Sequence, residues 1–136
     1  MLTILILATF VTAGQSGSQP TGCLHTAGQE KPADRDRSVA ALAATRAINT
    51  AQAAFAAKQT QSGATRKYAS RAELQSHVDA TRYNLSSGVE ITPGFMLTLD
   101  AFDSGYWFEI VDVKDTCGFR FVSNQSGLIL TAQPIR

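Results

Sequence analysis

The chain has 136 residues, of which 44% are hydrophobic and 17% are charged, so it can bury one modest core but not two. Its 12 Lys and Arg residues nearly balance its 11 Asp and Glu residues, and the formal net charge is +1. Because the basic residues are scattered, the long-range field is too weak to favour nucleic acid or an anionic membrane surface. The sequence therefore predicts one domain whose partners are not nucleic acids.

The chain opens with an apolar run, Leu2 to Val11 (LTILILATFV), and no charged side chain precedes Glu30. The run is shorter than the ~20 residues that span a bilayer, so we predict no stable transmembrane segment. It is typical of the apolar region of a secretory signal, and Val11-Thr12-Ala13 predicts cleavage after Ala13. Residues 1–13 are therefore predicted to be a signal peptide. A buried N-terminal strand is the alternative, because no Lys or Arg lies near Met1.

A flexible tether is predicted over residues 14–33, where Gly, Ser, Gln, Thr and Pro dominate without an apolar period. It contains Cys23, and the second cysteine of the chain is Cys117. In an exported protein the two can form a disulfide that stabilises the fold by roughly 4 kcal/mol. Lipid attachment at Cys23, or two unpaired thiols, are the alternatives.

The main helix is predicted to begin between Pro32 and Ser38 and to end near Lys58 to Gly63, with Gly63 as a left-handed cap. Small and apolar residues recur on one stripe of this helix, which we expect to pack on a sheet. The stripe consists of Ala40, Ala44, Ala47, Ile48, Ala51 and Phe55. The opposite, polar arc is predicted to carry Thr45, Arg46, Asn49 and Gln52.

A second, short helix is predicted after Ser70, because Ser70-Arg71-Ala72-Glu73 is a capping-box pattern. It is expected to end at about His77 or Val78. From Val89 onward, aromatic and β-branched residues alternate with turn signals, which predicts an antiparallel meander of four strands. The strands are expected at Phe95 to Phe102, Tyr106 to Val113, Gly118 to Ser123 and Leu128 to Gln133. Tyr106 to Val113 is predicted to be central, because it is apolar on both faces at its start.

These elements resemble the globular part of bacterial type IV pilin-like proteins and pseudopilins. The resemblance is carried by Arg46 to Gln52 (RAINTAQ) with a following aromatic, by Tyr68-Ala69, by the capped short helix, and by the closing hairpin CGFRFVSNQSGLIL. It implies an α+β domain over residues 34–136, in which one main N-terminal helix packs on a four-stranded antiparallel sheet. The family's Gly-Phe-Thr-Leu-Ile-Glu type cleavage motif, which leads directly into a long apolar helix, has no counterpart in this sequence.

Catalytic and metal-binding patterns find little support. The chain has two histidines, His25 and His77, and neither has the spacing of a metal-binding helix or of a Ser/His/Asp set. Four carboxylates at predicted strand ends could gather around a hard cation, although solvated turn acids are the simpler interpretation. They are Asp100, Asp103, Asp112 and Asp115. We therefore expect no enzyme activity, no cofactor and no metal.

The sequence thus predicts an exported, non-catalytic structural or interaction module at the bacterial envelope, secreted or periplasmic. The resemblance implies protein partners such as pilus or secretion-system components. A small periplasmic ligand-binding or inhibitor domain is the alternative. A secreted hydrolase with an unrecognised site is a third, minor interpretation.

Overall fold

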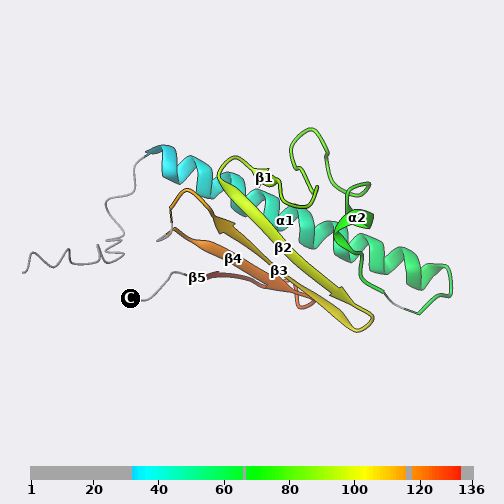
Figure 1. Ribbon diagram of the computed structural model, residues 1–136. Helices are drawn as coiled ribbons and strands as arrows, with labels where there is room; N and C mark the ends of the chain where they lie inside the picture. The colour runs from blue at the N-terminus through cyan, green and yellow to red at the C-terminus, as the bar shows by residue number, and fades with distance from the viewer. Residues whose placement is uncertain (1–31, 66, 116–117, 133–136) are drawn as a thin grey trace, which may run out of the picture.

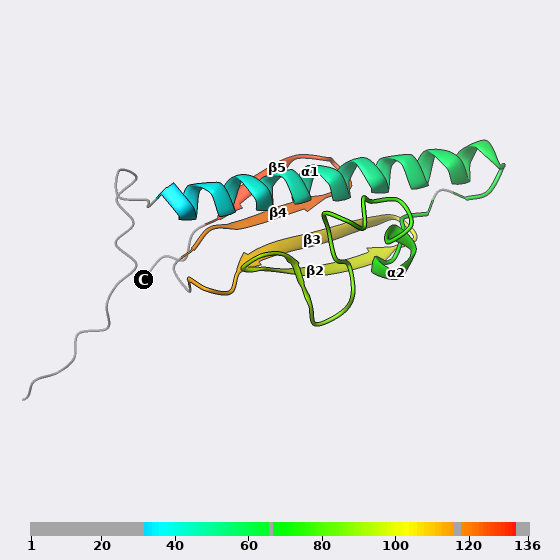
Figure 2. The same cartoon turned by 90° about the horizontal axis from the view of Figure 1, so that it is seen from above.

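The computed structural model describes residues 32–65, 67–115 and 118–132, and it has an α+β architecture of two layers. One layer is the 30-residue helix α1 (Pro32–Gln61), and the other is an antiparallel sheet (Figure 1). At 1.5 Å per residue α1 is about 45 Å long. Its C-terminal part extends past the sheet, as Figure 2 shows. Among the described residues, no helix is long and apolar enough to cross a membrane.

The sheet has five strands in the order β1-β2-β3-β4-β5, each antiparallel to its neighbour. The strands are β1 (Glu90–Thr92), β2 (Phe95–Phe102), β3 (Gly105–Asp112), β4 (Arg120–Asn124) and β5 (Ile129–Ala132). The prediction that the stretch after Tyr106 is central is confirmed, because β3 is the middle strand. The predicted number of four strands is wrong.

The missed strand, β1, has only three residues, too few for an alternating pattern to be visible in the sequence. It pairs with β2 across Pro93-Gly94, where Gly94 has φ +86° and the Gly94 N–H donates to the Glu90 carboxylate (2.7 Å). Ile91 at its centre is buried. The strand therefore depends on core packing and on its turn more than on its own composition.

The β2–β3 turn is shorter than predicted. The predicted strands leave Asp103 to Gly105 between them, but Phe102 pairs with Gly105, so the loop is Asp103-Ser104 and Gly105 is the first residue of β3, with no positive φ. A Cβ at Gly105 would lie 3.0 Å from the Gln125 side-chain oxygen. Glycine at this position thus permits a close approach of the β4–β5 turn and does not supply a left-handed turn.

Both predicted helix signals are confirmed. The Gly63 N–H donates to the Thr60 carbonyl and the Ala64 N–H to the Gln59 carbonyl, while Gly63 has φ +75°, which is a Schellman cap. The capping box at Ser70 begins α2 (Arg71–Leu74), which is shorter than expected because it ends at Leu74.

The face that α1 presents to the sheet is rotated from the predicted stripe. The fully buried positions on α1 are Ala41, Ala44, Thr45, Ile48, Ala51, Gln52 and Ala56. Two of them, Thr45 and Gln52, were predicted to be on the polar arc, and this was wrong. Their burial carries little penalty because both are hydrogen-bonded: the Thr45 hydroxyl donates to the Ala41 carbonyl (2.9 Å), and Gln52 pairs with the Ala69 backbone.

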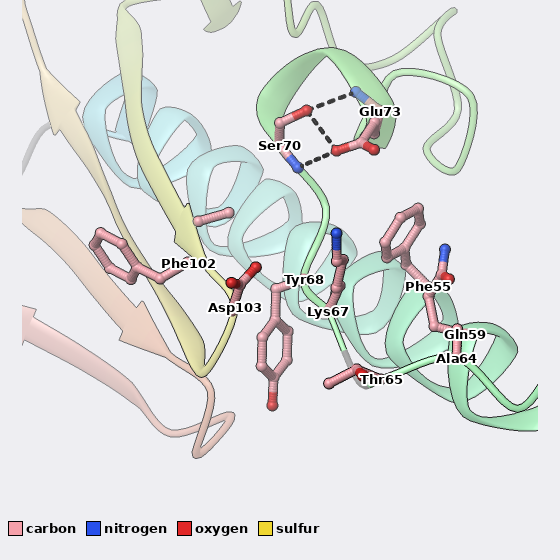
Figure 3. Close-up of a pocket in the computed structure, with 11 residues that line it drawn as sticks. Phe55, Gln59, Ala64, Thr65, Lys67, Tyr68, Ser70, Glu73, Phe102 and Asp103 are labelled. Atoms are coloured by element: carbon pink, nitrogen blue, oxygen red, sulfur yellow. Dashed lines mark hydrogen bonds between the residues drawn. The ribbon is translucent and has the colours of Figure 1, made fainter.

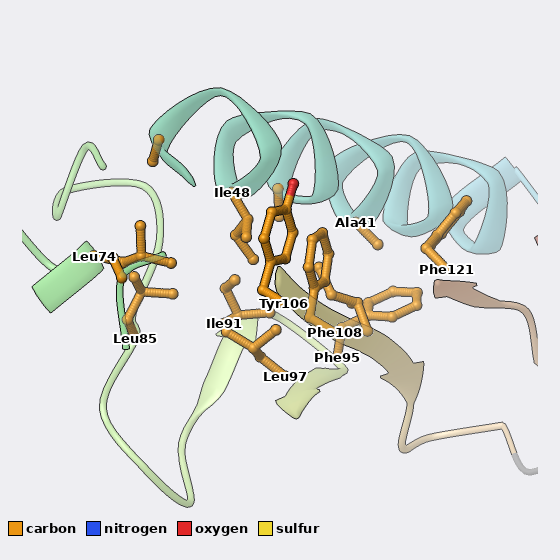
Figure 4. Packing of buried hydrophobic residues seen from close by; sticks show 14 residues of the cluster. Ala41, Ile48, Leu74, Leu85, Ile91, Phe95, Leu97, Tyr106, Phe108 and Phe121 are labelled. Carbon is orange, nitrogen blue, oxygen red and sulfur yellow. The ribbon is translucent and has the colours of Figure 1, made fainter. Parts of the chain in front are cut away.

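The core lies between α1 and the inner face of the sheet (Figure 4). Phe95, Ile91, Phe108 and Ile110 are its large, fully buried side chains from the strands, and Ile48 meets them from α1. Of the Tyr106-Trp107-Phe108 run, Tyr106 and Phe108 point inward while Trp107 is on the outer face, 37% exposed. The alternation follows directly from the two-residue period of a strand.

An ion pair fixes the N-terminal end of α1 to the sheet. Arg37 donates to both carboxylate oxygens of Asp112, at the end of β3, over 3.1 and 3.0 Å. Asp34, one turn earlier on α1, also contacts the guanidinium at 3.1 Å. These carboxylates raise the pKa of Arg37 above its usual value, so the charge is held at any accessible pH.

Candidate functional site

A groove of about 550 Å³ lies where the C-terminal part of α1 extends past the sheet (Figure 3). Four parts of the chain form it: α1, the connection from α1 to α2, α2 itself, and the end of β2 with the β2–β3 turn. The lining residues are Phe55, Gln59, Ala64, Thr65, Lys67, Tyr68, Ser70, Glu73, Ala101, Phe102 and Asp103. The groove thus combines aromatic rings with a mixed-charge rim.

The aromatic rings of the groove are held to different degrees. Phe55 is half-buried and packs edge-on against His77, with ring centroids 5.6 Å apart. Tyr68 packs against Tyr106 with centroids 5.1 Å apart. Phe102 is 55% exposed and points away from the other two rings (Figure 3). Such rings supply contact area to a partner at low conformational cost.

The capping box forms one rim of the groove. The Glu73 carboxylate accepts from the Ser70 hydroxyl (2.6 Å) and from the Ser70 N–H (2.8 Å), drawn as dashed lines in Figure 3. These hydrogen bonds lower the pKa of Glu73, so it is ionised at neutral pH. Lys67 and Asp103, which also line the groove, are exposed.

The groove is chemically suited to binding. Its lining contains no histidine or cysteine, so no Ser or Thr there has a base of that type beside it. His77, the one histidine within the described residues, follows α2 and contacts Phe55 through ring packing. The described lining therefore offers hydrophobic and charged contacts, and its hydroxyl–carboxylate pair, Ser70 with Glu73, is the capping box of α2.

The predicted carboxylates do not form a metal site. Asp100 and Asp103 lie at one end of β3, and Asp112 and Asp115 lie at the other, roughly 20 Å away at 3.3 Å per residue. Asp112 is instead paired with Arg37. No group of three or more His, Cys, Asp or Glu residues that could hold a metal ion occurs within residues 32–65, 67–115 and 118–132.

A polar cluster at the helix–sheet interface was missed by sequence reasoning. Asn49 was predicted to face solvent, yet its amide nitrogen donates to the Ser123 hydroxyl (2.9 Å) and to the Gly127 carbonyl (3.3 Å). The Tyr106 hydroxyl donates to the side-chain amide oxygen Oδ1 of Asn49 (2.9 Å). Burial, and then the neighbouring Tyr68, raise the pKa of Tyr106 to about 12. The cluster fixes the position of α1 over β3 and β4.

The outer face of the sheet is not covered by any described element (Figure 2). Phe102, Trp107 and Leu130 are 55%, 37% and 63% exposed there, and a salt bridge joins Arg120 to Glu109 (3.3 Å) on the same face. Exposed apolar side chains and a charged pair thus both occur on this face.

The predicted disulfide, Cys23 to Cys117, lies outside the described residues, as do the predicted signal peptide, most of the tether and His25.

Comparisons of the chain with protein-family models, with characterised proteins and with solved structures find no match.

Proposed function

We propose that this chain is the globular domain of an exported, pilin-like structural protein that acts through protein contacts at the bacterial envelope. One observation carries the proposal: a 30-residue helix lies across an antiparallel meander and extends past it at the C-terminal end. A meander places all strand connections at the ends of the sheet, so no connection crosses the helix and the groove at its C-terminal end stays accessible. The resemblance in RAINTAQ and in the closing hairpin points in the same direction.

The chemistry of the groove supports an interaction role over a catalytic one. Exposed aromatic rings with a mixed-charge rim are typical of protein-binding patches. Such a groove, at the end where α1 extends past the sheet, is accessible to a neighbouring subunit. We therefore assign it as the contact site of the proposed module.

The proposal is tested with the protein in its native host. An affinity-tagged chain is cross-linked in living cells and purified from the envelope fraction, and the attached proteins are identified by mass spectrometry. Pilus or secretion-system subunits are the expected partners, and the Lys67→Glu/Phe102→Ser double variant is expected to lose them. A matched control, Arg46→Glu with Val39→Ser, changes a basic and an apolar residue on the exposed side of α1.

Two results would contradict this function. A chain that stays in the cytoplasm with Met1 intact is not exported, and N-terminal sequencing detects this. Recovery of a bound small molecule in place of protein partners would favour the alternative, a periplasmic ligand-binding domain.

A further inference from the structure

The guanidinium of Arg71 occupies an unusual environment beside a second pocket. Arg71 is the first residue of α2, and its Nε–H donates to the Leu85 carbonyl (2.6 Å). Its terminal nitrogens donate to the carbonyls of Leu97 (2.7 Å) and Ser86 (2.6 Å). One side chain thus joins α2, the loop after it and β2.

No carboxylate neutralises this charge among the residues that the structure describes. Glu73, two residues along the chain, is turned toward Ser70 (Figure 3). A guanidinium has five N–H donors, of which three are used here, so two have no protein acceptor within the described chain. Burial without a compensating charge lowers the pKa of Arg71, which indicates that the cation is stabilised less than in water.

A pocket of about 490 Å³ adjoins this guanidinium, and its lining is Arg71, Ala72, Gln75, Leu85, Ser86 and Ser87. Ala72 and Leu85 are the apolar members of this lining, and Gln75, Ser86 and Ser87 are its neutral polar members. Leu85 itself is buried beside Leu74 in the core, so this wall is rigid (Figure 4). The pocket thus offers one unneutralised cation in a mainly apolar setting.

We propose that this pocket binds the carboxylate of an Asp or Glu side chain of a partner protein, with an apolar neighbour of that residue seated against the pocket wall. A carboxylate can accept from two guanidinium N–H groups at once, and one N–H on each terminal nitrogen of Arg71 is left after its three bonds to carbonyl groups. Its charge also compensates the cation that the fold leaves unpaired.

An acidic side chain fits better than a chain terminus. C-terminal carboxylates are captured by sets of free backbone N–H groups. Here the N–H of Leu85 is donated to Gln75, that of Ser86 to Asn84, and that of Val89 to the Ser86 carbonyl. The loop therefore has few backbone donors left, and recognition depends on the Arg71 side chain.

The test uses the full ¹⁵N-labelled chain and a blocked peptide, acetyl-Ala-Leu-Glu-Leu-Ala-amide, with its Gln analogue as the neutral control. The Arg71 Nε–H signal and the amide signals of Ser86 and Ser87 are expected to shift with the Glu peptide and to stay unchanged with the Gln peptide. Ser87→Glu places a competing carboxylate in the pocket without removing Arg71, and should weaken binding about tenfold or more. Ala80→Glu adds the same charge at an exposed position of the same loop, and should change the affinity by less than about twofold.

Several results would overturn the proposal. Equal binding of the Gln peptide shows that charge recognition is absent, and equal weakening by both Glu variants shows a long-range charge effect only. Unchanged binding by Ser87→Glu places the ligand elsewhere. Tighter binding of inorganic phosphate, or of a peptide with a free C-terminal Leu and no acid, identifies a different ligand. Arg71→Lys keeps the positive charge but loses the planar pair of N–H donors, and it is expected to bind the Glu peptide as weakly as Ser87→Glu does.

Discussion

Gln52 is the most informative position at which to test how α1 is held. Its side chain is 0% exposed and forms two hydrogen bonds with one residue: the Nε2 group donates to the Ala69 carbonyl (2.7 Å), and the Ala69 N–H donates to Oε1 (2.8 Å). Ala69 is also 0% exposed and lies 17 positions along the chain. A single amide thus joins α1 to the segment that leads into α2.

Gln52→Ala leaves the N–H and the carbonyl of Ala69 buried without a partner. Each unsatisfied buried group costs about 1–3 kcal/mol, so we expect the free energy of unfolding to fall by about 3 kcal/mol or more. Gln52→Met keeps most of the volume but none of the hydrogen bonds, and should lose nearly as much. The matched control is Gln61→Ala, at an exposed glutamine of the same helix, with an expected change of at most about 0.5 kcal/mol.

Urea unfolding followed by far-UV circular dichroism measures the stabilities, and amide hydrogen exchange at Ala69 reports the local effect. In Gln52→Ala this amide should lose most of its protection. The reasoning is refuted if Gln52→Ala and Gln61→Ala have equal stability, or if Gln52→Met matches the wild type, since packing alone would then account for the site.

Three further predictions concern the helix–sheet interface. Asn49→Ala and Ser123→Ala should each lower the free energy of unfolding by about 1–2 kcal/mol. Because the two side chains share hydrogen bonds, a double-mutant cycle in urea should give a coupling energy of about 1 kcal/mol, and strictly additive losses would contradict this. Phe108→Ala, at a fully buried ring, should cost about 4 kcal/mol, whereas Phe55→Ala, at a half-buried ring, should cost roughly half as much; equal losses would mean that burial does not set the cost. Because the pKa of Tyr106 is raised to about 12 in the folded state, the stability linked to its neutral hydroxyl is complete below pH ~10 and is lost as pH rises toward about 12. Ultraviolet titration of the folded protein should detect one tyrosine that ionises above the ordinary range, and Tyr106→Phe should remove this transition.

Local signals predicted the boundaries of this fold well. The Schellman cap at Gly63 and the capping box at Ser70 involve residues within five positions of one another, so their geometry depends on nearby sequence alone. The pairing of β2 with β3 was also predictable, because the two strands are consecutive in the chain and inward and outward side chains alternate along both. The α+β class follows from these elements.

The buried face of α1 could not be predicted from hydropathy, because alanine has almost no preference and polar residues occupy the interface. Thr45 and Gln52 are buried since the backbone satisfies their hydrogen bonds, and Gln52 needs a partner 17 positions away. Asn49 meets Ser123, 74 positions away. A helical periodicity assigns such residues to solvent, because it contains no information about distant partners.

The sites depend on tertiary structure for the same reason. Phe55 and Tyr68 line one groove with the end of β2 only because the β2–β3 turn packs near the end of α1. Arg71 reads as an ordinary exposed residue in a capping-box sequence, and only the folded loop turns it toward three carbonyl groups on two segments. The sequence by itself thus determined the cap that ends α1, the start of α2 and the positions of four of the five strands, since these depend on short-range hydrogen bonds and side-chain alternation. The tertiary structure alone decided which polar groups are buried and which surfaces can bind, because both depend on contacts between residues far apart in the chain.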